Sequence, residues 1–540
     1  MNAPETIEEH NKHIAAAYDQ VPYVSNAFFY SAPGNLRAAA HLYGIETVPL
    51  GQARVLELGC SAGGNLLPFA LAYPQATVVG VDLSSVQIER GQEVLRDLDV
   101  RNMRLHAMDL AAITPDFGQF DYIIVHGVFS WVPAEVKQAI LRICRENLSP
   151  LGIAYVSYNT YPGWKAGDIV RDALMLHCHG AADEQERLGR AKAMLFMLSE
   201  GLAQSHGMGA SIRKMADSLR RQSDYYIAHE YLERFNTPCY LVEFADAVEQ
   251  AGLAYVGDAE AYSELPSTYG ANVQLKLNLM ALGQSKVMRQ QYLDFAMGRN
   301  FRKSLLVHQG RAAQIEVLPR REALRDLRWA GRFTRYEEKE QPAEYRSYRG
   351  LMNRTVHTRD DAVISLAEAV DAVWPKTLAH DELCEKVRQI SSHLDGEELR
   401  NATDTALEKL FAMGMLRQAL EPGPYDQAVD TGPDLQLIAG FAYLHDRSNA
   451  PDFGLTPINF WHDSVRVQMS EPQAWLLRHL DGPVDRRRAI ALLAKGLQQG
   501  AVNGPNQQSY RGARNLEPLA QKIVNDLINV LRGCGLLLGK

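Results

Sequence analysis

The residues from 55 to 66, VLELGCSAGGNL, constrain the fold of this 540-residue chain more than any other segment. They have the pattern of a buried strand, a turn that contains glycine, and the start of a helix. Gly59 and Gly63 would let the backbone approach a ligand where a Cβ atom would collide. Free amides at the start of a helix favour a carboxylate. Glu57, near the end of the strand, is placed to receive the amino group of an amino-acid-like ligand.

This segment is not the fingerprint of a dinucleotide-binding site. That fingerprint needs glycine at positions 59, 61 and 64, and position 61 is Ser61. The spacing acid-x-Gly-x-x-x-Gly instead resembles motif I of class I methyltransferases, whose ligand has no pyrophosphate to hold. Other enzymes of that class often have glycine in place of Ser61, and we expect a small residue to suffice there.

Short β-rich runs alternate with helical patterns through the first third of the chain. This alternation predicts an α/β fold with a parallel, doubly wound, Rossmann-like sheet. The expected strands are Ala53–Leu58, Thr77–Asp82, Met103–Met108, Phe120–His126 and Ile153–Ser157, and the expected helices are Leu66–Ala72, Ser85–Asp97 and Glu135–Asn147.

Acids stand at the ends of two further strands. Asp82 ends the second, where a carboxylate can accept both ribose hydroxyls of a nucleoside. Asp109 follows the third and could accept from an adenine amino group, although a single acid at a strand end is more often a helix cap. With Glu57, these acids would line the carboxyl edge of the sheet, where such folds bind ligands.

The fourth strand leads into His126 and the sequence GVFSWVP. In class I methyltransferases this position faces the transferable methyl group. It lacks the Asn/Asp-Pro-Pro-Tyr signature of enzymes that methylate the amino groups of nucleic-acid bases. His126 and Trp131 are candidate pocket residues, with packing under the loop as the alternative for Trp131. The later segment YNTYPGW, which begins with Tyr158 and Asn159, could cage an ammonium group through cation–π contact.

The aromatic segment from Tyr18 to Phe28 precedes the first strand. It could fold over the ligand as a lid, with Tyr23 and Ser25 in contact. The alternative is a helix packed on the edge of the sheet.

The pattern is helical from Asp168 to Leu219, and strand-like runs return at Gly252–Gly257 and Leu305–Gln309. The economical interpretation is a helical insertion into a sheet that gains two more strands. Because an inserted hairpin with many apolar residues cannot bury both faces alone, we expect dimerisation through it. Further helices are expected at Phe244–Ala251 and Met288–Met297.

The C-terminal part of the chain is predicted to divide into two further domains. Residues 311–349 are charged and predict a connector, extended strands or a solvated face, and residues 421–434 are rich in proline and glycine. A weak repeat aligns residues 406–416 with 527–537 in a frame that resembles a winged helix. The expected last helices carry few basic residues, which favours structural or protein contact over DNA reading. The predicted domains are 1–164 with 225–310, the insertion 165–224, a middle domain 311–425 and a C-terminal domain 426–540.

Composition narrows the functional class. The net charge is −8, whereas domains that bind nucleic acid are usually basic. The six cysteines are scattered, with no C-x-x-C pair, and predict neither disulfides nor a metal site. The first 18 residues lack the features of a secretory signal, and no apolar run is long enough to span a bilayer. We therefore expect a cytoplasmic protein without membrane insertion.

Several segments together resemble bacterial methyltransferases that carry a methyltransferase regulatory domain. That family includes protein-lysine methyltransferases that modify an outer-membrane protein. The resemblance implies S-adenosylmethionine as methyl donor, a dimerising helical insertion, a middle domain and a C-terminal domain. It is carried by YDQVPYVS from Tyr18, LELGCSAGGNLLP from Leu56, VDLS from Val81, HGVFSWVP from His126, SYNTYPGW from Ser157, YYIAHEYL from Tyr225 and FRKSLLV from Phe301.

The predicted function is protein-lysine N-methylation by a homodimer. The alternatives are a small-molecule O- or N-methyltransferase and a protein that binds S-adenosylmethionine as a signal without turnover. The predicted acceptor-site residues are Tyr23, His126, Trp131, Tyr158 and Asn159. The predicted cofactor contacts are Tyr18, Glu57, Gly59, Cys60, Ser61, Gly63, Asn65, Asp82, Leu83, Gln87, Asp109, Leu110 and His126.

Overall fold

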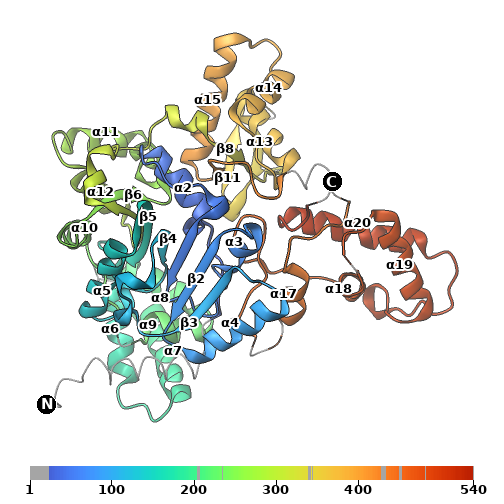
Figure 1. The fold of residues 1–540 in the computed structure, drawn as a ribbon, viewed down its shortest axis with the longest axis horizontal. Helices are drawn as coiled ribbons and strands as arrows, with labels where there is room; N and C mark the ends of the chain where they lie inside the picture. Colours follow the sequence, from blue (N-terminus) through green and yellow to red (C-terminus); the bar gives the residue numbers. More distant parts are fainter. Residues whose placement is uncertain are drawn as a thin grey trace.

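The computed structural model describes residues 24–203, 207–233, 235–338, 342, 344–426, 433–448, 450, 453–480 and 482–538. A seven-stranded sheet in the order β3-β2-β1-β4-β5-β7-β6 lies at its centre (Figure 1). The five strands β1 to β5 run parallel, and β7 runs antiparallel to both β5 and β6. The α/β, Rossmann-like fold is thus confirmed. The strands are β1 Arg54–Leu58, β2 Thr77–Asp82, β3 Met103–Ala107, β4 Phe120–Val125, β5 Leu148–Asn159, β6 Leu253–Asp258 and β7 Phe301–His308.

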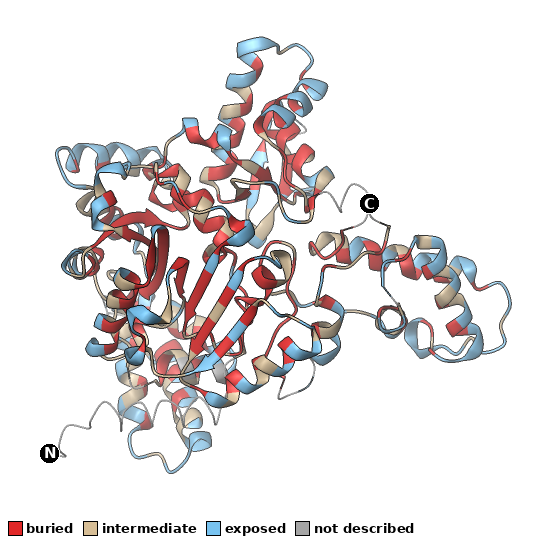
Figure 2. Cartoon of the chain, in the orientation of Figure 1, coloured by how far each residue is buried: buried red, intermediate tan, exposed pale blue. Residues whose placement is uncertain are grey.

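Helices cover both faces of this sheet, so its central strands are apolar throughout rather than alternating. Tyr122 and Ile124 of β4 pack with the helices α2 (Pro33–Leu42), α3 (Leu67–Ala72) and α4 (Ser85–Asp97). Ile123 and Val125 face the other way, toward α5 (Ala134–Glu146) and α10 (Leu241–Gln250). Figure 2 shows the strands buried and the outer helices exposed on one side.

The predicted helical insertion is present between β5 and α10. It consists of α6 (Trp164–Cys178), α7 (Glu184–Glu200), α8 (Gly209–Arg220) and α9 (Asp224–Tyr231). These helices have a hydrophobic core of their own, separate from the two layers of the sheet.

The two returning strands were also expected, with different ends. The structure begins β7 at Phe301, whereas the sequence predicted a strand only from Leu305. The helices α11 (Ala271–Met280) and α12 (Lys286–Met297) connect β6 to β7.

The charged segment after β7 contacts the helix α15 (Gly396–Ala412), and its side chains Arg321 and Arg325 stay exposed to solvent. Arg321 and Arg325 form ion pairs with Glu408 and Asp404 on the helix α15. The segment contributes short strands and is followed by three helices that pack on one another. These elements are β8 Arg328–Ala330, β9 Thr334–Tyr336, β10 Arg346–Arg349, β11 Thr355–Thr358, α13 Asp361–Val373, α14 His380–Ile390, α15 Gly396–Ala412 and β12 Arg417–Ala419.

The last helices are α17 (Phe441–Arg447), α18 (Glu471–Arg478), α19 (Arg486–Gln499) and α20 (Glu517–Gly533). They have a separate core, and α19 projects away from the sheet (Figure 1).

The internal repeat is visible in the local structure of α15 and α20. Both helices have 17 residues. Each is followed by a glycine with positive φ, Gly414 at 62° and Gly535 at 70°. The winged-helix assignment stays a prediction. Among the described residues, the helices are all too short or too polar to cross a bilayer.

Candidate functional site

The glycine loop lies where β1 ends. Gly59 and Gly63 have φ of 76° and 79°, and a Cβ on Gly59 would stand 2.4 Å from Cγ2 of Val128. Both positions therefore need glycine. Ser61 also has a positive φ, 52°. The expectation that a small residue suffices at Ser61 stays a prediction, and the left-handed backbone is a further constraint at this position.

Glu57 is buried at the end of β1 and has one free oxygen. Its Oε1 accepts a hydrogen bond from Nδ2 of Asn65 at 2.7 Å. Its Oε2 is buried and has no hydrogen-bond partner among the described residues. Burial, with a smaller contribution from Asp82, raises the pKa of Glu57 to about 8, against the opposing Asn65 hydrogen bond. A cationic amino group would donate a hydrogen bond to this oxygen and neutralise the charge of the carboxylate. The residues present therefore fit the amino-acid part of S-adenosylmethionine.

Asp82 ties the end of β2 to the glycine loop. Its Oδ2 accepts the backbone N–H of Ser61 at 2.7 Å, and its Oδ1 accepts that of Ser84 at 3.0 Å. The Ser61 hydroxyl donates to Oε1 of buried Gln87. Leu83 lies between these contacts and is partly exposed. The predicted ribose site is therefore a connected group of polar residues.

Two predicted cofactor contacts have visible structural roles. Asp109 caps the short helix η3 (Leu110–Ala112), with Oδ1 accepting the N–H of Ala111 at 2.9 Å. The capping alternative thus holds, and a contact of Asp109 or Leu110 with adenine stays a prediction. Cys60 is buried beside the loop, and burial raises the pKa of its thiol well above the usual range.

The segment that follows residue 23 lies on the glycine loop. Ser25 Oγ accepts the N–H of Gly64 at 2.8 Å, and Asn65 Oδ1 accepts the N–H of Phe28 at 2.9 Å. The predicted contacts Tyr18 and Tyr23 fall outside the described residues. For Ser25, the structure shows contact with the loop.

His126 follows β4 and is held between aromatic rings. Its Nδ1 lies 2.9 Å from the Tyr155 hydroxyl, and the centroid of its ring is 4.0 Å from that of Phe28. Burial, and then the nearby Lys303, lower the pKa of His126 to about 3. Its imidazole is therefore neutral at physiological pH.

A lysine already lies over aromatic rings beside His126. Nζ of Lys303 is 4.9 Å from the centroid of the Tyr30 ring and 5.6 Å from that of Phe301, and it pairs with Glu260. The Phe301 ring meets His126 edge-on at 6.3 Å. Sequence reasoning missed these residues because they come from β7 and the first helices, far from the glycine motif in the chain.

The remaining acceptor-site candidates have different surroundings. Trp131 ends the short helix η5 and is partly exposed. Asn159 is buried, and its amide donates to Oδ1 of Asn236 at 3.0 Å. Tyr158 is 1% exposed and stacks on Phe244 in the core. This placement weakens the prediction that Tyr158 contacts a substrate, because packing already uses its ring.

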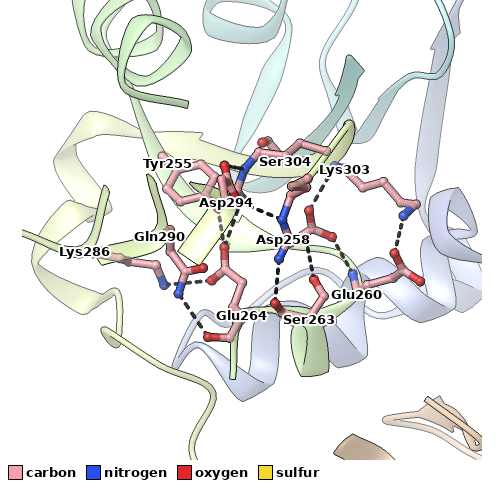
Figure 3. Close-up of polar contacts among 12 residues, drawn as sticks. Tyr255, Asp258, Glu260, Ser263, Glu264, Lys286, Gln290, Asp294, Lys303 and Ser304 are labelled. Atoms are coloured by element: carbon pink, nitrogen blue, oxygen red, sulfur yellow. Dashed lines mark hydrogen bonds and ion pairs between the residues drawn. The ribbon is translucent and has the colours of Figure 1, made fainter. Parts of the chain in front are cut away.

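A group of buried charged residues lies beside β7, next to Lys303 and Ser304 (Figure 3). Arg302 is fully buried and donates to both carboxylate oxygens of Asp294, at 2.8 and 2.7 Å. Glu264 accepts from the Tyr43 hydroxyl at 3.0 Å, and the Tyr255 hydroxyl also donates to it. Because these charges are paired and hydrogen-bonded, they hold β7 in one position, and with it Phe301 and Lys303.

Two family models match this part of the chain. Residues 55–152 match a methyltransferase domain, and residues 223–308 match a domain described as "Predicted methyltransferase regulatory domain". The first match contains β1 to β4 and most of the glycine-loop site. The second contains β6 and β7 of the same sheet.

Known proteins share both sequence and fold. Uncharacterized protein RP028 of Rickettsia prowazekii is 37% identical over 235 residues, which are 43% of this chain and 94% of that protein. Uncharacterized protein RP789 of the same species is 37% identical over 310 residues, 57% of this chain and 54% of that protein. The chain thus spans about half the length of RP789.

Among solved structures, PKMT2 from Rickettsia typhi has a TM-score of 0.81 at 24% identity and covers 95% of this chain and 99% of its own. Its complex with AdoHcy gives a TM-score of 0.79. The shared fold therefore extends over nearly the full length of both chains.

Proposed function

Because the chain belongs to the methyltransferases that carry a methyltransferase regulatory domain, we propose that it methylates lysine side chains of a protein substrate, with S-adenosylmethionine as donor. The oxygen Oε2 of Glu57 carries the proposal, because it is buried beside a glycine loop at the carboxyl edge of the sheet and finds no hydrogen-bond partner in the described part of the chain. The lysine substrate is supported by the fold shared with PKMT2, a protein lysine methyltransferase.

On the donor side, bound S-adenosylmethionine supplies an electrophilic methyl group on a sulfonium. Glu57 would hold its amino group through the oxygen Oε2. Asp82 accepts from the ribose hydroxyls, and Asp109 from the adenine amino group. These contacts fix the direction from which an acceptor can approach.

On the acceptor side, the protein must bind a lysine as its neutral amine. An ammonium buried among Phe28, Phe301 and neutral His126 loses solvation, which lowers its pKa. The positive charge of Lys303 nearby acts in the same direction, although Glu260 offsets part of it. The site thereby favours the reactive form and excludes water from it.

Incubation with labelled donor and a cell lysate tests the proposal. A labelled protein band whose label maps to lysine by mass spectrometry supports it. Label confined to small molecules favours the small-molecule alternative. Binding of AdoHcy without any transfer favours a regulator that senses the cofactor.

Dimerisation through the helical insertion is part of the same proposal. Leu176 on α6 is 79% exposed, and Phe196 on α7 is 57% exposed, and an interface through the insertion would bury both side chains. Light scattering of the double variant Leu176→Glu, Phe196→Glu tests it. A monomer is expected, and a dimer of unchanged mass would refute this assignment.

The six cysteines form no disulfide, which fits the reducing cytoplasm as the proposed location of the protein.

A further inference from the structure

A histidine from the C-terminal part of the chain reaches the glycine loop. His462 Nε2 is hydrogen-bonded to the backbone carbonyl of Asn65, 397 residues earlier in the sequence. Because a carbonyl can only accept, Nε2 carries the proton and donates it. Burial lowers the pKa of His462 to about 4, so the ring is neutral at physiological pH.

The loop that carries His462 is fixed on both sides of the ring. Oδ1 of Asn459 accepts the backbone N–H groups of Trp461 and Asp463, both at 2.9 Å. Asp463 also pairs with Arg417 at 2.9 Å. His462 itself has a φ of 59°, in the left-handed region that few residues other than glycine adopt. Strain of this kind persists where the surrounding structure over-determines a conformation, and it is concentrated at functional sites.

Asn65 connects this loop to the carboxylate that receives the donor. Its backbone carbonyl accepts from His462, while its side chain donates to Oε1 of Glu57 at 2.7 Å. The neighbouring residue Gly64 donates to Ser25, whose own N–H donates to the carbonyl of Gly454 at 2.7 Å. The segments around Ser25 and around His462 thus both contact the glycine loop.

We propose that His462 is a positioning residue of the cofactor site. It holds the backbone of Asn65, so that the Asn65 side chain keeps Glu57 oriented with Oε2 open to the donor. The C-terminal part of the chain therefore completes the donor site from behind the loop. This inference rests on the proposed function, because it assigns the glycine loop to S-adenosylmethionine.

Calorimetric titration with AdoHcy tests it on the full chain. His462→Leu removes the donor and is expected to weaken binding about tenfold, the effect of one lost hydrogen bond. His462→Gln keeps an amide N–H that can reach the carbonyl, and it should restore most of the affinity. The control variant His445→Leu removes a second histidine of the C-terminal part, which is half-buried and lies on α17. This variant should leave the affinity for AdoHcy unchanged.

Binding by His462→Leu equal to that of the natural protein would overturn the inference and leave the proposed function intact. Absence of AdoHcy binding by the natural protein would instead overturn the proposed function. If His462→Leu does not fold, hydrogen exchange of the natural protein tests the inference instead. By linkage, AdoHcy should slow exchange in residues 453–467. Unchanged exchange there would contradict the coupling.

Discussion

The Tyr155 hydroxyl lies 2.9 Å from Nδ1 of His126, and this contact orients the ring. Burial raises the pKa of Tyr155 well above its usual range, so the phenol keeps its proton. In the tautomer in which this phenol donates to Nδ1, the proton of the neutral ring is on Nε2. His126 would then present a donor to the proposed acceptor and would not serve as its base.

We expect Tyr155→Phe to slow methyl transfer about tenfold, since it removes the hydrogen bond that orients His126. The affinity for AdoHcy should change little, as the hydroxyl of Tyr155 is hydrogen-bonded to His126. Transfer rate and calorimetric affinity, measured on the same preparation, separate the two effects. A parallel loss of affinity would show that Tyr155 acts on the donor site.

Donor binding should depend on pH through Glu57. With a pKa of about 8 before binding, the carboxyl is protonated at pH 6, whereas a cationic amino group requires the carboxylate. A proton must leave on binding, so affinity should rise between pH 6 and 8 by up to about tenfold per pH unit. Calorimetry in buffers of different ionisation enthalpy measures the released proton.

Glu57→Gln is the matched control for that pH dependence. It should bind AdoHcy more weakly and without the slope between pH 6 and 8. The same raised pKa stabilises the cofactor-free protein below the unfolded pKa, near 4, and this stability is lost as pH rises toward 8. If the slope persists in Glu57→Gln, another group is responsible for it.

Asp82→Ala should weaken AdoHcy binding by about 1.5–3 kcal/mol, the range for a hydrogen bond to a charged group. The variant also leaves the N–H groups of Ser61 and Ser84 without this acceptor, which loosens the loop. Asp82→Asn keeps one side-chain oxygen and should lose less. Calorimetric affinity that is unchanged in Asp82→Ala would contradict the placement of the ribose.

Gly59→Ala should prevent donor binding and destabilise the protein. The positive φ would cost about 1–2 kcal/mol, and the close approach to Val128 about 1–3 kcal/mol more. Adding Val128→Ala should recover the second contribution and not the first. Thermal denaturation of the single and double variants measures both. Full recovery in the double variant would show that the backbone conformation is not a constraint.

Arg302→Met should destabilise the protein, because Asp294 and Glu264 each lose a buried ion-pair partner. The cost should stay below the about 3–5 kcal/mol of a fully uncompensated buried charge, since Arg299 also pairs with Asp294, at 2.8 Å. In an Asp294→Asn background the same change should cost less, since the charge at Asp294 is gone. A double-mutant cycle in denaturation experiments isolates this coupling. Additive costs would mean that the pair does not interact.

The sequence predicted those features of the fold that depend on residues close to one another in the chain. The ends of β1 and β2, and the turn between β1 and α3, follow from hydrophobic runs and glycine spacing within a few residues of Glu57. The two added strands were expected from their composition, although β7 begins four residues earlier than predicted because polar Arg302 and Ser304 hide its start. Both side chains are buried, and Arg302 has its charge partner on α12.

Long-range contacts could not be predicted in this way. Lys303 and Phe301 join His126 only because β7 inserts next to β5. His462 meets Asn65 through a loop whose sequence has no motif. Ser61 shows the same limit at short range, since its identity does not reveal the sign of its φ.

The regulatory-domain match contains β7, the strand between β5 and β6, so its boundary near residue 223 cuts through a single hydrogen-bonded sheet. A gene fusion that exchanged this portion between relatives would transplant half of a hydrophobic core together with Phe301 and Lys303 of the proposed acceptor site. Chimeras with a crossover at that boundary, which lies between α8 and α9 of the helical insertion, should therefore aggregate through an uncovered strand edge.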